Sequence, residues 1–96
     1  MLDHSEYPEQ IWPMLEALDR YADTGRPLGG FLSSVICNEF KEACMRADNT
    51  NRRFLWHFAV YVCNELPSVC HGSREIYSQW LKTGGLEGQR KLHGKA

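Results

Sequence analysis

Apolar residues recur every three or four positions along most of this 96-residue chain, the spacing of α-helices that bury one face. The first predicted helix runs from Pro13 to about Asp23, because proline is tolerated in a first helical turn and Gly25 is typical just past a helix end. The second runs from about Leu28 to Arg46. Its core-facing stripe consists of Leu32, Ile36, Phe40, Ala43 and Ala47.

A third helix is predicted from the cluster of cap-forming residues at 48–51, and it ends before Pro67 because the residue before proline disfavours helical geometry. Residues 54–63 are apolar on nearly every side, so we expect a central helix surrounded by protein. Their aromatic and β-branched content also fits a strand. However, the uninterrupted segment is longer than a typical strand.

A fourth helix completes the predicted fold. Ser73 is a suitable N-cap, and the helix is expected to run to about Lys82. We predict an all-α fold, a compact bundle of about four helices, in a single domain over residues 1–96. Residues 1–7 are expected to form a flexible acidic arm, and residues 86–96 a flexible basic tail.

The apolar content is high for so short a chain, since 43% of the residues are hydrophobic. A domain of this size buries only about 60–65% of its unfolded surface, and association commonly covers the excess. We therefore expect a homo-oligomer. The net charge of −1 gives no general attraction to DNA, RNA or membranes.

The charge is distributed unevenly. Residues 1–24 contain six acidic residues against Arg20 alone, whereas residues 25–96 contain ten Lys and Arg against six acids. The N-terminus lacks the basic and apolar regions of a signal peptide. The longest apolar run, 54–63, has about half the length of a membrane span. We expect a soluble intracellular protein whose cysteines are reduced.

Cysteine and histidine form no recognisable metal motif. Zinc ligands usually come in pairs two to four residues apart, whereas Cys37 and Cys44, like Cys63 and Cys70, are separated by seven. Cys70 and His57 are a formal nucleophile pair, but the surrounding sequence supplies no orienting group or oxyanion site. We predict no metal, no cofactor and no enzymatic activity.

Residues 25–31 contain the best candidate for an anion site. Arg26 and Pro27 precede the glycines at 29 and 30, at the predicted start of the second helix. A helix N-terminus carries partial positive charge and N–H groups without internal partners, and glycines allow close approach to the backbone. The alternative is that these glycines only form a tight turn between two helices.

Three further arginines form a candidate second anion site. Arg52 and Arg53 lie in the first turn of the third predicted helix, and Arg74 follows the N-cap of the last. Each is equally an ordinary surface residue. Arg90, Lys91 and Lys95 are too few to indicate nucleic-acid binding. Tyr7, in a segment outside the predicted helices, could stack on a planar base or belong to the core.

Several short motifs occur in a characteristic order: Gly-x-Pro-x-Gly-Gly-Phe-Leu, Asn-Glu-Phe-x-x-Ala, Arg-Ala-Asp-x-x-Asn, Asn-x-x-Pro, Gly-Ser and Trp-Leu. They lie at residues 25–32, 38–43, 46–51, 64–67, 72–73 and 80–81. This pattern resembles a group of small phage-encoded helical proteins that includes the second family of phage anti-CBASS proteins, which are cyclic-oligonucleotide sponges.

The resemblance implies an all-helical homo-oligomer, hexameric in that family, in the host cell cytoplasm. Such proteins bind cyclic dinucleotides such as cyclic GMP–AMP between subunits without cleaving them, and this sequestration blocks bacterial CBASS immunity. By resemblance, Arg26 would contact the phosphates and Tyr7, or failing that Trp12, would stack on a base. The expected ligand-binding residues are Tyr7, Arg26, Pro27, Leu28, Gly29, Gly30 and Phe31.

The chain departs from the family pattern in two respects. Family members have lysine where this chain has Arg26, which keeps the charge but changes the geometry of a phosphate contact. The family also binds cyclic trinucleotides in separate pockets where subunits meet in threes. The hydroxyl residue expected at Leu28 and the arginine expected near Pro67 for that purpose are absent here, so one of the three further arginines would have to substitute.

A protein-binding role is the alternative function. A small helical inhibitor could dock onto a host defence or regulatory protein through an apolar face around Phe31 and Val35. A small hydrolase or metal-dependent enzyme is the third and weakest hypothesis.

Overall fold

The structure is a computed structural model that describes residues 4–93. Within that range the regular secondary structure is entirely helical, which confirms the all-α prediction. Residues 1–3 of the predicted acidic arm and residues 94–96 of the predicted basic tail lie outside the described residues.

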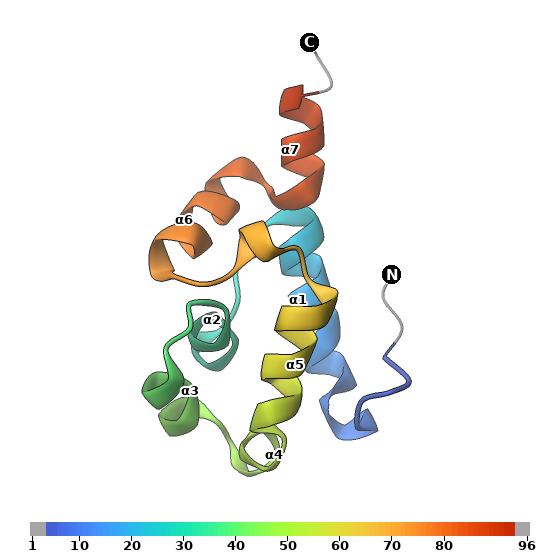
Figure 1. The fold of residues 1–96 in the computed structure, drawn as a ribbon, viewed down its shortest axis with the longest axis vertical. Helices are drawn as coiled ribbons and strands as arrows, with labels where there is room; N and C mark the ends of the chain where they lie inside the picture. The colour runs from blue at the N-terminus through green and yellow to red at the C-terminus, as the bar shows by residue number, and fades with distance from the viewer. Residues whose placement is uncertain (1–3, 94–96) are drawn as a thin grey trace.

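Seven α-helices and two 3-10 helices follow one another over residues 4–93 (Figure 1). They are η1 (Glu9–Ile11), α1 (Trp12–Thr24), α2 (Gly30–Ile36), α3 (Phe40–Arg46), α4 (Asn49–Arg53), α5 (Leu55–Glu65), η2 (Ser68–Cys70), α6 (Arg74–Thr83) and α7 (Gly85–His93). The number exceeds the predicted four because two predicted helices are interrupted and the tail is helical.

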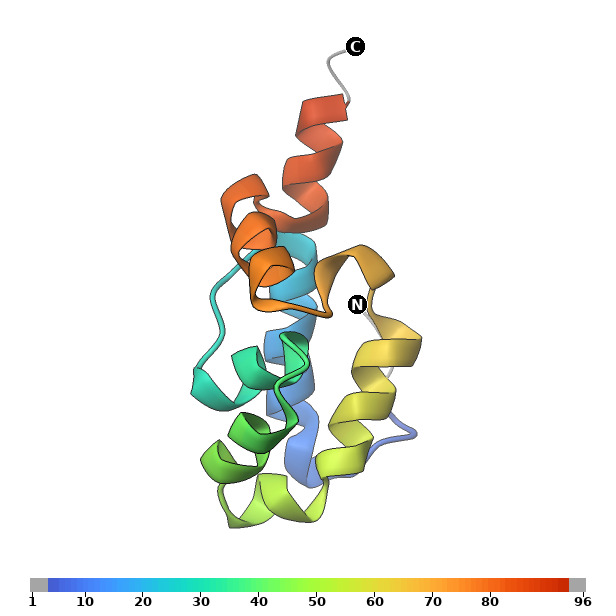
Figure 2. The ribbon, with the colours of Figure 1, turned by 60° about the vertical axis from the view of Figure 1, so that its left-hand side comes forward.

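Helix α1 runs through the middle of the molecule and contacts α5 and α7 (Figures 1 and 2). It begins with Pro13 in its first turn and ends at Gly25, whose φ of 71° is left-handed, as the sequence predicts. The core around it is built from apolar residues of most of the helices. Its fully buried large side chains include Ile11, Leu15, Leu18, Tyr21, Ile36, Phe58 and Tyr61.

The predicted second helix is interrupted, and the expectation of one helix from 28 to 46 was wrong. Asn38 adopts a left-handed backbone with φ 61° and ends α2. The N–H of Asn38 donates to the carbonyl of Val35 (3.2 Å), and the N–H of Glu39 donates to that of Ser34 (2.9 Å). This is a Schellman motif, in which asparagine can replace glycine because its short side chain tolerates left-handed geometry.

The predicted third helix is also divided. Asp48 caps α4 as expected, because its carboxylate accepts a hydrogen bond from the N–H of Asn51 at 2.7 Å. Phe54 then leaves helical geometry, with φ −120° and ψ 26°, and α5 begins at Leu55. Helix α5 ends at Glu65, two residues before Pro67.

Helix α5 is covered on one side only, so the expectation of a helix surrounded by protein was wrong for the single chain. Phe58, Tyr61 and Val62 are buried. On the opposite side, the Trp56 side chain is 64% exposed and Cys63 is also exposed. The apolar sequence of this helix therefore leaves an unburied face on the surface.

The predicted flexible tail is instead helical as far as His93. Ser73 caps α6 as predicted, its hydroxyl accepting from the N–H of Ile76 (3.1 Å), and Gly84 ends α6 in a left-handed conformation. The chain then turns into α7, which packs against α1. Leu86 contacts the core, which gives this helix the tertiary support that the sequence pattern did not reveal.

The described part of the N-terminal arm is held against the body. His4 Nε2 lies 2.8 Å from Oδ2 of Asp19 and 3.1 Å from the hydroxyl of Tyr61, which itself donates to Oδ1 of Asp19. Asp19 is buried. This network connects residue 4 to both α1 and α5, so residues 4–7 are not the free arm that was expected.

Candidate ligand-binding site

The segment between α1 and α2 projects backbone and one arginine into solvent. We call residues 26–30 the Arg26 turn. Arg26, Pro27 and Gly29 are exposed, and a Cβ atom built on Gly29 meets nothing within 4 Å. A ligand can therefore approach the backbone at Gly29, as the sequence predicts for this position.

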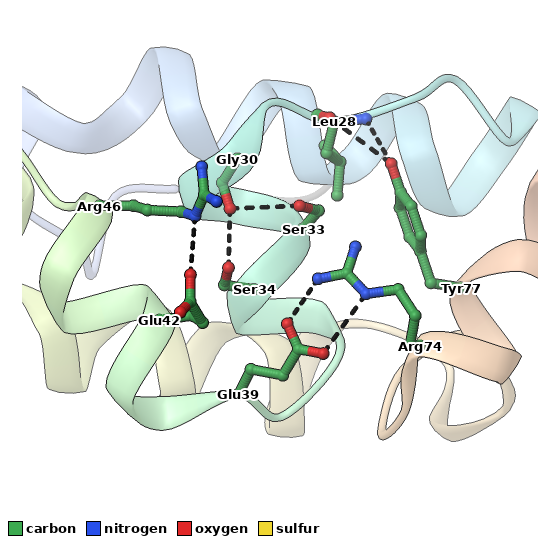
Figure 3. A network of polar contacts seen from close by, with 9 residues as sticks. All are labelled: Leu28, Gly30, Ser33, Ser34, Glu39, Glu42, Arg46, Arg74 and Tyr77. Carbon is green, nitrogen blue, oxygen red and sulfur yellow. Dashed lines mark hydrogen bonds and ion pairs between the residues drawn. The ribbon is translucent and has the colours of Figure 1, made fainter.

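The Arg26 turn is anchored at its centre by Tyr77 of α6 (Figure 3). The N–H of Leu28 donates to the Tyr77 hydroxyl at 3.0 Å, and that hydroxyl lies 3.5 Å from the Leu28 carbonyl, to which it donates. Leu28 is half-buried as a result of this packing. The two bonds fix the path of the turn without using the side chain of Arg26.

A second cation lies beside the same turn. A Cβ on Gly30 would be 2.8 Å from Nη1 of Arg46, so the guanidinium passes directly over this glycine. Nε of Arg46 donates to Glu42 at 3.0 Å, which orients the guanidinium (Figure 3). Sequence reasoning treated Arg46 only as the end of a helix. The signal for its position was Gly30, where the absent side chain makes room for it.

The helix start contributes less positive charge than predicted. Helix α2 has only seven residues, Gly30–Ile36, and its N-cap, Gly29, supplies no side-chain cap bond. A short helix has few aligned peptide dipoles, so the positive charge at the Arg26 turn comes mainly from Arg26 and from Arg46, which is itself ion-paired with Glu42.

Phe31 points into the core and not toward a ligand. It is 8% exposed and packs edge-on against Phe58, with ring centroids 5.1 Å apart. Of the apolar docking face expected around Phe31 and Val35, Phe31 is therefore covered within the chain. Val35 remains half-buried.

Tyr7 lies elsewhere on the molecule. Its ring packs edge-on against Tyr61 of α5 at 5.0 Å, and its carbonyl accepts from Nε1 of Trp12 at 2.9 Å. Burial, with smaller effects from Glu65 and Glu6, raises the pKa of the Tyr7 hydroxyl. The N-terminal segment runs along the side of α1 opposite α2 in both views of the fold (Figures 1 and 2). Tyr7 is thus separated from the Arg26 turn within one chain.

The three arginines of the candidate second anion site fall into two groups. Arg74 is paired with Glu39 through two hydrogen bonds, from Nη2 and from Nε (3.3 Å), so its guanidinium is engaged (Figure 3). The hydrogen bond from Arg74 lowers the pKa of Glu39. Arg52 and Arg53 are exposed at the end of α4.

Arg52 and Arg53 border a groove with a volume of about 710 Å³, which we call the α5 groove. Its walls are formed mainly by α2, α3 and α5, and its residues include Val35, Phe40, Ala43, Arg52, Arg53, Trp56, Ala59, Cys63 and His71. Phe40 and Trp56 are among the most exposed large apolar side chains, at 76% and 64%. The sequence pattern had assigned Phe40 to the core.

Cys70 and Asp19 are both buried. Burial raises the pKa of Cys70 to about 12, so its thiol is a poor nucleophile at neutral pH. Asp19 is a buried member of the network with Tyr61. Within residues 4–93, no group of three or more His, Cys, Asp or Glu side chains is arranged to hold a metal ion.

None of the helices in the described range has both the length and the apolar character needed to cross a bilayer. No protein-family model, curated protein or solved structure matches the chain.

Proposed function

We propose that this protein binds a cyclic dinucleotide, such as cyclic GMP–AMP, at the Arg26 turn and sequesters it without cleavage. The observation that carries the proposal is a turn that combines the exposed Arg26 with open backbone at Gly29, and whose Gly30 lies under the guanidinium of Arg46. Arginine binds phosphate through several N–H groups in a planar fork. In a phage-infected cell this sequestration would deny the messenger to CBASS effectors, as the sequence resemblance implies.

The proposed site requires more than one copy of the chain. Tyr7, which would stack on a base, contacts α5, whereas the Arg26 turn contacts α6. A two-fold symmetric pair would present two copies of each group, which matches the two phosphates and two bases of the ligand. We therefore also propose a homo-oligomer, with the hexamer of the resembling family as the expected state.

Binding and chemical fate can be tested together. The purified protein is titrated calorimetrically with a panel of cyclic di- and trinucleotides, and the bound ligand is recovered by denaturation and analysed by chromatography. We expect saturable heat with a cyclic dinucleotide and recovery of the intact ring. Absence of heat with every cyclic nucleotide would refute the proposal, and linear products would indicate an enzyme.

Inhibition of a host protein is the second candidate function. The observation favouring it is the exposure of Phe40 (76%) and Met45 (80%) on α3, since exposed apolar groups of this size often mark protein interfaces. Capture of a host defence protein that is lost in Phe40→Ser/Met45→Ser, together with a silent nucleotide titration, would favour this function over sequestration.

A further inference from the structure

The α5 groove combines features that the proposed function does not use. Its lining includes Arg52 and Arg53, the exposed indole of Trp56, and His71. The cavity of about 710 Å³ falls within the range of roughly 300–1,000 Å³ typical of small-molecule sites. Such sites are mostly apolar with a few polar groups that fix the ligand's orientation, and this groove has that composition.

Arg52 and Arg53 both have N–H groups that make no hydrogen bond among residues 4–93. Arg52 donates one hydrogen bond, from Nη2 to the carbonyl of Ala47 at 3.2 Å, out of five available N–H groups. The guanidinium of Arg53 lies over the Phe54 ring, 5.7 Å from its centroid. Neither arginine is in an ion pair among residues 4–93. Two consecutive arginines that are not ion-paired and that line the same groove favour an anionic group beside them.

Trp56 offers one free aromatic face. The His57 ring covers the other face, with centroids 3.7 Å apart and planes inclined by 32°. An indole that is supported on one side and 64% exposed is a suitable platform for a planar ring, because bases stack on aromatic side chains in nucleic-acid complexes.

We propose that the α5 groove binds a nucleoside monophosphate or a similar planar ring that carries a phosphate. The phosphate contacts Arg52 and Arg53, and the base stacks on Trp56. The volume and the single open indole suit one ring and one anion, whereas a protein partner typically needs an interface of about 1,200–2,000 Å². This site is separate from the Arg26 turn and does not depend on it.

Quenching of tryptophan fluorescence tests the proposal. Trp80 is buried and Trp12 is half-buried, so Trp56 should dominate any change caused by a ligand in the groove. We expect saturable quenching by AMP or GMP at micromolar to millimolar concentration, and at least tenfold weaker effects with adenosine or inorganic phosphate alone. Quenching should disappear in Trp56→Phe.

Charge variants locate the phosphate contact. Arg52→Gln/Arg53→Gln should weaken AMP binding at least tenfold, whereas Arg26→Gln, a matched change outside the groove, should leave it unchanged. Circular dichroism checks that each variant is folded. Quenching by none of the mononucleotides, unchanged affinity in the double variant, or a Trp56 already shielded from acrylamide in the unliganded oligomer would overturn the proposal.

The same variants separate this site from the proposed function. If cyclic GMP–AMP binding is lost only in Arg26→Gln and AMP binding only in Arg52→Gln/Arg53→Gln, both proposals hold. If AMP binds normally to a protein that gives no heat with cyclic nucleotides, the proposed function fails and the groove site stands. If the protein binds cyclic GMP–AMP but no mononucleotide quenches Trp56 fluorescence, the groove site is refuted and the proposed function stands.

Discussion

The Nη1 atom of Arg46 lies 2.8 Å from the point where a Cβ of Gly30 would stand, so the guanidinium occupies space that a side chain at position 30 would need. The two residues are separated by the whole of α2 and α3, and the reversal of the chain at Asn38 brings them together. This relationship adds a second cation to the turn that already carries Arg26.

Two variants should establish the role of Arg46. In Gly30→Ala the new methyl group displaces the flexible guanidinium, so we expect cyclic dinucleotide affinity to fall about tenfold while the fold persists. Arg46→Gln removes the guanidinium itself and should weaken binding to a similar extent. Wild-type affinity in both variants, measured by calorimetry, would remove Arg46 from the site.

The left-handed residue at 38 should have a measurable effect on stability. Asn38→Ala places an ordinary side chain at φ 61°, which should lower the free energy of unfolding by about 1 kcal/mol, whereas Asn38→Gly should preserve or raise it. Urea denaturation of both variants provides the comparison. A stable Asn38→Ala would contradict the assignment and favour the continuous helix that the sequence pattern predicts.

The buried network of His4, Asp19 and Tyr61 should stabilise the N-terminal segment. Burial, followed by the hydrogen bond to Asp19, raises the pKa of Tyr61 above its ordinary value, so its hydroxyl remains a donor throughout the neutral range. Tyr61→Phe removes that donor from a buried carboxylate and should cost about 1–3 kcal/mol. Tyr7→Phe, on the same aromatic cluster, should change the free energy of unfolding by less than about 0.5 kcal/mol.

Thiol reactivity should follow burial. At pH 8 the exposed Cys63 should react readily with a disulfide reagent, whereas Cys37 and Cys70 should react only on unfolding. Both buried thiols have a raised pKa, about 12 for Cys70, and so remain protonated at that pH. Rapid modification that persists in Cys63→Ser and involves Cys70 would contradict the packing of η2 against the core.

The sequence predicted helices and their caps well where the signal is local. Gly25, Asp48 and Ser73 each end or begin a helix as expected, because capping depends on a few neighbouring residues. The interruption at Asn38 was missed, since the apolar stripe continues through it. Helix α7 was missed because its stability depends on contact with α1, which no local pattern encodes.

The candidate site was predicted in part. The open backbone at Gly29 and the exposed Arg26 follow from local chemistry, and both are found where the sequence suggests. Arg46 and the α5 groove arise from tertiary packing between residues far apart in sequence. Phe31 looked accessible in the pattern but is buried against Phe58, because helical spacing alone does not tell which of two neighbouring apolar lines faces the core.

The most direct test of cyclic dinucleotide binding is calorimetric titration of Arg26→Gln with cyclic GMP–AMP beside the wild type. Arg90→Gln, an exposed arginine of α7, is the charge-matched control. Loss of a charge-assisted phosphate contact of about 1.5–3 kcal/mol predicts at least a tenfold weaker affinity in Arg26→Gln. The affinity of the control should equal that of the wild type. Equal affinity in all three proteins, or no binding to the wild type, would contradict the account.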